Sequence, residues 1–147
     1  MLYQKITMKK ILFLLILTPF LITCDSEDFN NTNPYLPNYS FSYDIDLNLP
    51  SNSSLNFISN AIYYNDPGLG VRGIIVFNAG NGMFNAFDAG CPNQPLAACS
   101  TMTISGVNAV CPCDNASYSL FTGQGNLEYP MKRYRVQVNG TVIRVYN

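Results

Sequence analysis

The stretch that decides the fold runs from residue 88 to residue 123 and contains two short cysteine motifs. The first motif is Cys91-Pro92-Asn93, and the second is Cys111-Pro112-Cys113-Asp114. Together with Cys99, the two motifs hold four of the five cysteines, whereas the chain contains no histidine. Four cysteines can form disulfides in three different pairings, which the count alone leaves open.

The chain around this stretch has the pattern of an all-β domain. Residues 41–49 alternate apolar and polar side chains with a period of two, which predicts a strand with one buried face. The pairs Asn81-Gly82 and Asn139-Gly140 lie between apolar runs and predict two hairpins. The predicted strands are 41–49, 61–64, 73–77, 83–87, 102–104, 107–110, 118–121, 133–138 and 142–146. The segments 50–54 and 66–70 have the composition of turns.

The N-terminus has the composition of an export signal. Basic residues up to Lys10 precede an apolar run from Ile11 to Ile22, with either Met1 or Met8 as the start. A run of about 12 residues is too short for a transmembrane anchor, which needs about 20. We therefore expect residues 1–23 to be a signal peptide.

The residues that follow the apolar run resemble a bacterial lipobox. Leu21-Ile22-Thr23-Cys24 resembles this motif, except that Thr23 stands where Gly, Ala or Ser is usual. In a lipobox the cysteine becomes the lipidated first residue of the mature protein. The acidic run 25–28 resembles sorting determinants of Gram-negative outer-membrane and surface lipoproteins. The resemblance implies membrane attachment through Cys24, with an unpaired cysteine as the alternative. We expect residues 24–40 to be a flexible tether and residues 41–147 to be the domain.

The charge of the mature chain argues against one class of partner. The full chain has a net charge of -1, and loss of residues 1–23 leaves five basic against nine acidic groups. A weakly acidic chain without a basic stripe does not bind nucleic acid by electrostatics. Lys132, Arg133 and Arg135 form the one basic cluster of the mature sequence. We expect a solvated strand face there, with a docking patch for an acidic partner as the alternative.

The two cysteine motifs and the hairpins that flank them resemble the Rieske iron–sulfur family. In that family the loops read Cys-x-His and Cys-x-x-His, and each loop gives one Cys to one iron of a 2Fe–2S cluster and one His to the other. Tyr118 and Gly123 match the aromatic and glycine positions that follow the second loop. The resemblance covers about residues 62–145. It implies a Rieske-like antiparallel β-sandwich of short hairpins with two cysteine-bearing loops at one tip.

The ligand positions differ from those of the family. Cys91 and Cys111 match its thiolate ligands, but Asn93 and Asp114 stand at the imidazole positions. An amide is a poor donor to iron, and a carboxylate is a hard anionic ligand. We therefore expect a degenerate member with no metal and no cofactor. The alternative is a 2Fe–2S cluster held by Cys91, Asn93, Cys111 and Asp114, or by a set of thiolates that includes Cys99 or Cys113.

The resemblance also implies how the cysteines pair without iron. Two thiolates that bind one iron lie close enough for modest loop movement to form a Cys91–Cys111 disulfide. Cys99 and Cys113 match a second disulfide that some Rieske proteins have between their loops. An exported protein enters an oxidising compartment, where paired thiols form disulfides.

The expected function is that of a lipid-anchored binding or structural module of the cell envelope, with an envelope protein as partner and no catalytic residues. An electron carrier is the alternative, as a component and not a stand-alone enzyme. A thiol-exchange enzyme built on Cys111-Pro112-Cys113 is disfavoured, because Asp114 does not lower a thiol pKa and no histidine can act as a base. Asp88 and Asp114 could form a hydrolytic carboxylate pair, but acidic loop residues more often cap turns.

Overall fold

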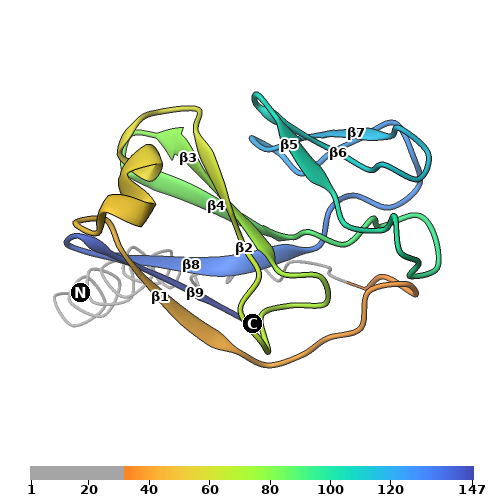
Figure 1. The fold of residues 1–147 in the computed structure, drawn as a ribbon, viewed down its shortest axis with the longest axis horizontal. Coiled ribbons are helices and arrows are strands. Elements are labelled where there is room, and N and C mark those ends of the chain that lie inside the picture. Colours follow the sequence, from red (N-terminus) through yellow and green to blue (C-terminus); the bar gives the residue numbers. More distant parts are fainter. Residues whose placement is uncertain (1–31) are drawn as a thin grey trace, which may run out of the picture.

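The computed structural model describes residues 32–147, which form two antiparallel β-sheets (Figure 1). The larger sheet has the strand order β1-β9-β8-β4-β3-β2, and the smaller sheet has the order β5-β6-β7. The bounds are β1 Ser42–Asp46, β2 Ala61–Tyr64, β3 Ile74–Gly80, β4 Met83–Asp88, β5 Thr103–Ser105, β6 Asn108–Val110, β7 Ser117–Ser119, β8 Arg133–Asn139 and β9 Val142–Tyr146. The predicted all-β fold of short hairpins is confirmed. Among residues 32–147, no helix is long and apolar enough to cross a membrane.

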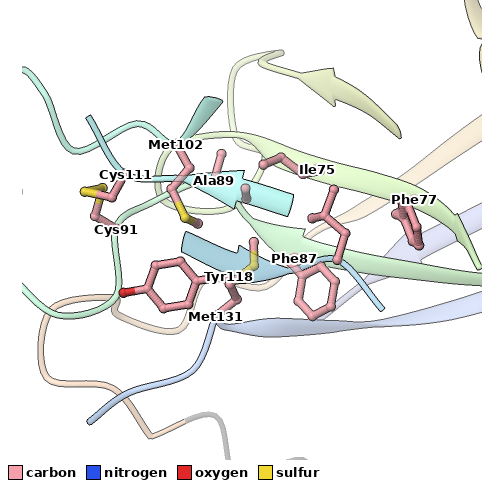
Figure 2. Close-up of a cluster of buried hydrophobic side chains, with 11 residues drawn as sticks. Ile75, Phe77, Phe87, Ala89, Cys91, Met102, Cys111, Tyr118 and Met131 are labelled. Carbon is pink, nitrogen blue, oxygen red and sulfur yellow. A yellow bond between two sulfur atoms is a disulfide. The ribbon is translucent and has the colours of Figure 1, made fainter. Parts of the chain in front are cut away.

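Strand β3, which lies beside the edge strand β2 in the larger sheet, is buried on both faces and therefore contributes to two cores. Successive side chains of a strand point to opposite faces, so Ile74 and Val76 enter one core while Ile75 and Phe77 enter the other. We call the first the long-strand core, which consists of Ile45, Leu55, Leu69, Ile74, Val76, Ala86, Tyr134, Ile143 and Val145. We call the second the cysteine core, which consists of Ile75, Phe77, Phe87, Ala89, Cys91, Met102, Ala109, Cys111, Tyr118, Leu120 and Met131 (Figure 2).

Both predicted hairpins are present. The β3–β4 turn has positive φ angles at Asn81 (54°) and Gly82 (74°), as a two-residue turn of this hand requires. The β8–β9 hairpin turns at Gly140-Thr141, one residue later than the predicted Asn139-Gly140, because Asn139 still pairs with Val142; Gly140 has a φ of 61°. Strand β3 extends beyond the predicted residue 77 to Gly80, with a register irregularity between Asn78 and Gly80.

The first strand is shorter than its alternating pattern predicts. β1 ends at Asp46, and a 3-10 helix (η2, Pro50–Asn56) follows where only a turn was expected. The carboxylate of Asp46 accepts the backbone N–H of Asn48 at 2.9 Å, and its carbonyl accepts the Asn52 side chain at 2.8 Å. These local hydrogen bonds turn the chain away from the sheet before residue 49, in spite of the apolar Leu47 and Leu49.

The segment before β1 packs against the domain. Leu36 is 1% exposed, and the Asn33 side chain donates to the Pro92 carbonyl at 2.8 Å. The Lys132 Nζ donates to the Leu36 carbonyl at 3.0 Å. The prediction of a flexible tether over residues 24–40 is therefore wrong for residues 33–38, and the domain begins before residue 41. The predicted signal peptide and Cys24 lie outside the described residues.

Candidate functional site

The four cysteines of the two loops form two disulfides at one tip of the domain. Cys91 is bonded to Cys111 with a Cα–Cα distance of 5.6 Å, and Cys99 is bonded to Cys113 with a Cα–Cα distance of 5.2 Å. The first bond is buried at one end of the cysteine core, which also contains Met102 and Tyr118 (Figure 2). The second bond reaches the surface at Cys99. These are the two pairs that the family resemblance implies.

The two disulfides lie next to each other. The Sγ atoms of Cys91, Cys111 and Cys113 are all within 4.8 Å of one another. The Gln94 Nε2 donates a hydrogen bond to the Cys111 Sγ at 3.0 Å, and the Ser100 Oγ lies 3.8 Å from the Cys113 Sγ. The tip therefore gathers four sulfur atoms and two polar neighbours in a small volume.

Asp88 fixes the start of the first loop. Its side chain is fully buried, and its Oδ2 accepts the Tyr134 hydroxyl and the Val71 N–H, each at 2.6 Å. Its Oδ1 accepts the Gly90 N–H at 2.6 Å, one residue before the first cysteine. Burial is the largest of the causes that raise the pKa of Tyr134, so this hydroxyl stays protonated and remains a donor to Asp88. Asp88 therefore holds the loop in place, and the hypothesis of a hydrolytic pair with Asp114 is not supported.

Asp114 caps the turn of the second loop. Its Oδ1 accepts the Ala116 N–H at 2.9 Å, and the side chain is exposed. The Cys111 N–H and the Ala116 carbonyl close the same turn at 2.9 Å, and Asn115 between them has a positive φ of 60°. Capping a turn is the ordinary role of an acidic loop residue, as the sequence favoured.

Asn93 stands at the first imidazole position, and its side-chain amide is fully hydrogen-bonded within the domain. Its Nδ2 donates to the Tyr118 hydroxyl at 2.9 Å and to the Tyr129 carbonyl at 2.7 Å. Its Oδ1 accepts the Tyr129 N–H at 2.8 Å. Both amide protons and the oxygen are therefore engaged, and no donor atom is directed to a metal. With Asp114 in a turn and the cysteines paired, the residues present do not fit a Rieske cluster.

The two scaffold positions of the second loop have clear structural roles. Tyr118 is 1% exposed, and burial raises the pKa of its hydroxyl. Gly123 has a φ of 76°, and a Cβ at this position would lie 2.7 Å from the Phe87 ring. A side chain at Gly123 would collide with the cysteine core, and Tyr118 is part of that core, so both positions serve packing.

The predicted basic cluster does not form a surface patch. Lys132 is 2% exposed, and burial lowers the pKa of its ammonium group. Arg133 is partly buried, with its guanidinium 5.8 Å from the Phe87 ring centre and bonded to the Asn85 side chain. Arg135 alone of the three is exposed. The alternative of an acidic docking partner at this cluster is therefore not supported.

Sequence reasoning missed one feature beside the tip. A cavity of about 380 Å³ is lined by residues that include Tyr63, Asp66, Arg72 and Thr101. The Arg72 Nη2 donates to the Ala97 carbonyl in the first loop at 2.8 Å, while its Nε is buried without a hydrogen-bond partner. No motif marks this arginine, because the turn at 66–70 and the first loop meet only in the folded chain.

Comparisons with known proteins find similarity at the level of structure. No protein-family model and no curated protein matches the chain. The chain is similar to the ferredoxin of carbazole 1,9a-dioxygenase from Nocardioides aromaticivorans IC177, with 19% identity, a TM-score of 0.44, and coverage of 63% of this chain and 90% of that one. The Sphingomonas yanoikuyae B1 ferredoxin is 18% identical, with a TM-score of 0.43 and coverage of 62% of this chain and 88% of that one. A chain from the complex of reduced oxygenase and oxidised ferredoxin in carbazole 1,9a-dioxygenase is 21% identical, with a TM-score of 0.44 and coverage of 60% of this chain and 82% of that one.

Two of these neighbours are ferredoxins by name, and the third comes from a complex of an oxygenase with a ferredoxin. The described part of the chain has two antiparallel sheets and two cysteine-bearing loops at one tip, which is the all-β arrangement of short hairpins that its sequence predicts.

Proposed function

We propose that this chain is a lipid-anchored protein of the bacterial cell envelope whose Rieske-like domain has lost its iron–sulfur cluster and acts as a disulfide-cross-linked binding or structural module. The observation that carries the proposal is the bonding of the tip. The Cys91–Cys111 and Cys99–Cys113 disulfides occupy every sulfur of the two loops. A thiol must be free and deprotonated to bind iron, so these bonds and a cluster exclude each other.

The replacement of both histidines supports the same proposal. The Asn93 amide joins the first loop to Tyr118 and to the backbone of Tyr129, and the Asp114 carboxylate closes the second loop. Side chains at the two former ligand positions thus hold the loops themselves. A module of this kind contributes a rigid surface and not a redox centre.

The location in the envelope rests on the sequence. Residues 1–23 have the pattern of a lipoprotein signal, and Cys24 is the residue that would carry the lipid. The acidic run 25–28 favours the outer membrane or the cell surface of a Gram-negative-type bacterium. The partner in this proposal is another envelope protein, because the module would be anchored in the envelope. The small number of basic residues disfavours nucleic acid as the partner.

The state of the tip is tested on the full chain purified from membranes without reductant. We expect no iron, no visible absorption band, no EPR signal after reduction, and no titratable thiol at the four loop cysteines. Stoichiometric iron with a reduced-state EPR signal would instead establish the alternative, a 2Fe–2S electron carrier.

The anchor is tested by growth with radiolabelled palmitate. We expect label in the wild-type chain and none in Cys24→Ser, while a Cys99→Ser variant keeps the label. Label that persists in Cys24→Ser would refute the proposed lipid site.

A further inference from the structure

Three sulfur atoms of the tip lie as close together as the ligands of one metal ion, and the fourth is bonded to one of them. The Sγ atoms of Cys91, Cys111 and Cys113 are within 4.8 Å of one another, and Cys99 is bonded to Cys113. Zinc–sulfur bonds of about 2.3 Å in a tetrahedron place neighbouring sulfurs about 3.8 Å apart. Once the two S–S bonds are reduced, the two sulfurs of each pair would have to move apart to this spacing to form a closed four-thiolate shell.

The surroundings of the sulfurs suit thiolates. The Gln94 Nε2 lies 3.0 Å from the Cys111 Sγ and donates to it. Such a hydrogen bond is stronger to an anionic sulfur than to a disulfide sulfur, because the acceptor then carries charge. Donors in this position orient metal ligands and tune their basicity. The Ser100 Oγ lies 3.8 Å from the Cys113 Sγ and donates to the Pro95 carbonyl at 3.2 Å, so its proton would have to leave that carbonyl to serve a thiolate.

The two disulfides differ in burial, since Cys91–Cys111 is buried whereas Cys99–Cys113 reaches the surface at Cys99. Cys91 and Cys111 are 1% and 0% exposed and lie in the cysteine core (Figure 2). Cys99, in contrast, is exposed on the first loop. A reductant and a metal ion can therefore reach the outer disulfide first, whereas the inner pair stays out of water.

We propose that the reduced tip binds one zinc-type divalent cation through Cys91, Cys99, Cys111 and Cys113. Two molecules of a dithiol reductant would each pass two electrons and two protons to one S–S bond and become disulfides themselves. The four protein thiols would then release four protons as they bind the cation. The same tip is thus closed by sulfur–sulfur bonds when oxidised and by a metal when reduced. This site needs neither sulfide nor a ligand at Asn93 or Asp114, and it goes beyond the function proposed above.

Cobalt provides the direct test, because tetrahedral cobalt thiolates absorb strongly in the visible region. The full chain is reduced anaerobically with a dithiol, freed of reductant and titrated with Co²⁺ alone. We expect one equivalent to bind with the tetrahedral spectrum and Zn²⁺ to displace it. Cys111→Ser should abolish that spectrum, and Cys24→Ser should retain it. Absence of the spectrum in the wild-type chain, or its persistence in Cys111→Ser, would overturn the proposal.

A second variant tests the site without removal of a ligand. Gln94→Leu should weaken zinc affinity about 10- to 100-fold, because it removes the donor to Cys111. Gln124→Leu, at an exposed glutamine away from the sulfurs, should leave the affinity unchanged. Equal affinities in the two variants would exclude the role assigned to Gln94. The result is independent of the cluster question, since iron in the protein as isolated contradicts only the function proposed earlier.

Discussion

The two cores on either face of β3 are closed by different means. The long-strand core is closed by β8 and β9, whose hairpin pairs Arg135 through Asn139 with Val142 through Tyr146, and by β1. The cysteine core is closed by three strands of three residues each, and all three residues of β5 are exposed. Strands so short supply few ladder hydrogen bonds. The comparison shows that covalent cross-links hold one side of a domain where extended pairing holds the other.

The largest effect should come from a cavity in the long-strand core. Ile74→Ala removes a fully buried side chain of β3, the strand that contributes to both cores, and should lower the free energy of unfolding by about 2–5 kcal/mol. Urea unfolding measures this, with Val138→Ala as a control at a 42% exposed position. Because β3 belongs to both cores, both sheets should unfold together. Loss of the larger sheet alone would show that the two cores are independent.

A local effect is expected from removal of the inner disulfide. Cys91→Ala/Cys111→Ala opens a bridge with a sequence separation of 20, worth roughly 3 kcal/mol on the chain-entropy estimate. Hydrogen exchange should show lost protection in β5, β6 and β7, while β8 and β9 stay protected. Equal loss of protection in both sheets would contradict the inference that the disulfides stabilise mainly the side of the cysteine core.

The smallest effect concerns alkaline pH and lies on the long-strand side. The Tyr43 hydroxyl donates to the Asp66 Oδ2 at 2.6 Å, and this hydrogen bond is the main cause that raises its pKa from 10.0 to about 12. The folded state then keeps a proton that the unfolded state loses. The contribution to stability is full below pH 10 and is lost as the pH rises to about 12.

Tyr43→Phe should therefore make the fall in unfolding free energy between pH 10 and pH 12 less steep. Tyr39→Phe, at a 53% exposed position, serves as the matched control. Burial also raises the pKa of Tyr64 and of Tyr134, so part of the fall should remain in both variants. If the unfolding free energies of Tyr43→Phe and Tyr39→Phe depend on pH in the same way, the hydrogen bond from Tyr43 to Asp66 does not contribute to the alkaline loss of stability.

Local patterns were sufficient to predict much of this fold. The two Asn-Gly pairs and the alternation around them identify β3, β4, β8 and β9, although the second turn lies one residue later, at Gly140-Thr141. Turn chemistry and a buried face are properties of a few adjacent residues. The resemblance of the two loops supplied the disulfide pairs. Strand ends were less accurate, as at Asp46, where a side chain competes with the ladder for the backbone.

Features made by distant segments were not predictable from local patterns. Lys132 reads as part of a basic surface cluster, but it is buried against the carbonyl of Leu36, 96 residues away. Asp88 reads as a loop acid, yet it binds Tyr134 from another strand. In each case the partner is far along the chain, so composition and periodicity near the residue carry no information about it.

The contact between Asn33 and Pro92 has a mechanical consequence. Tension applied to the chain before residue 33 would be transmitted into the loop of Cys91, whose bond to Cys111 resists extension. If Cys24 carries the lipid that we propose, the nine residues from Cys24 to Asn33 reach at most about 30 Å. The sulfur-rich end would then be held near the bilayer, and the opposite end, with the β3–β4 turn, would point away from it.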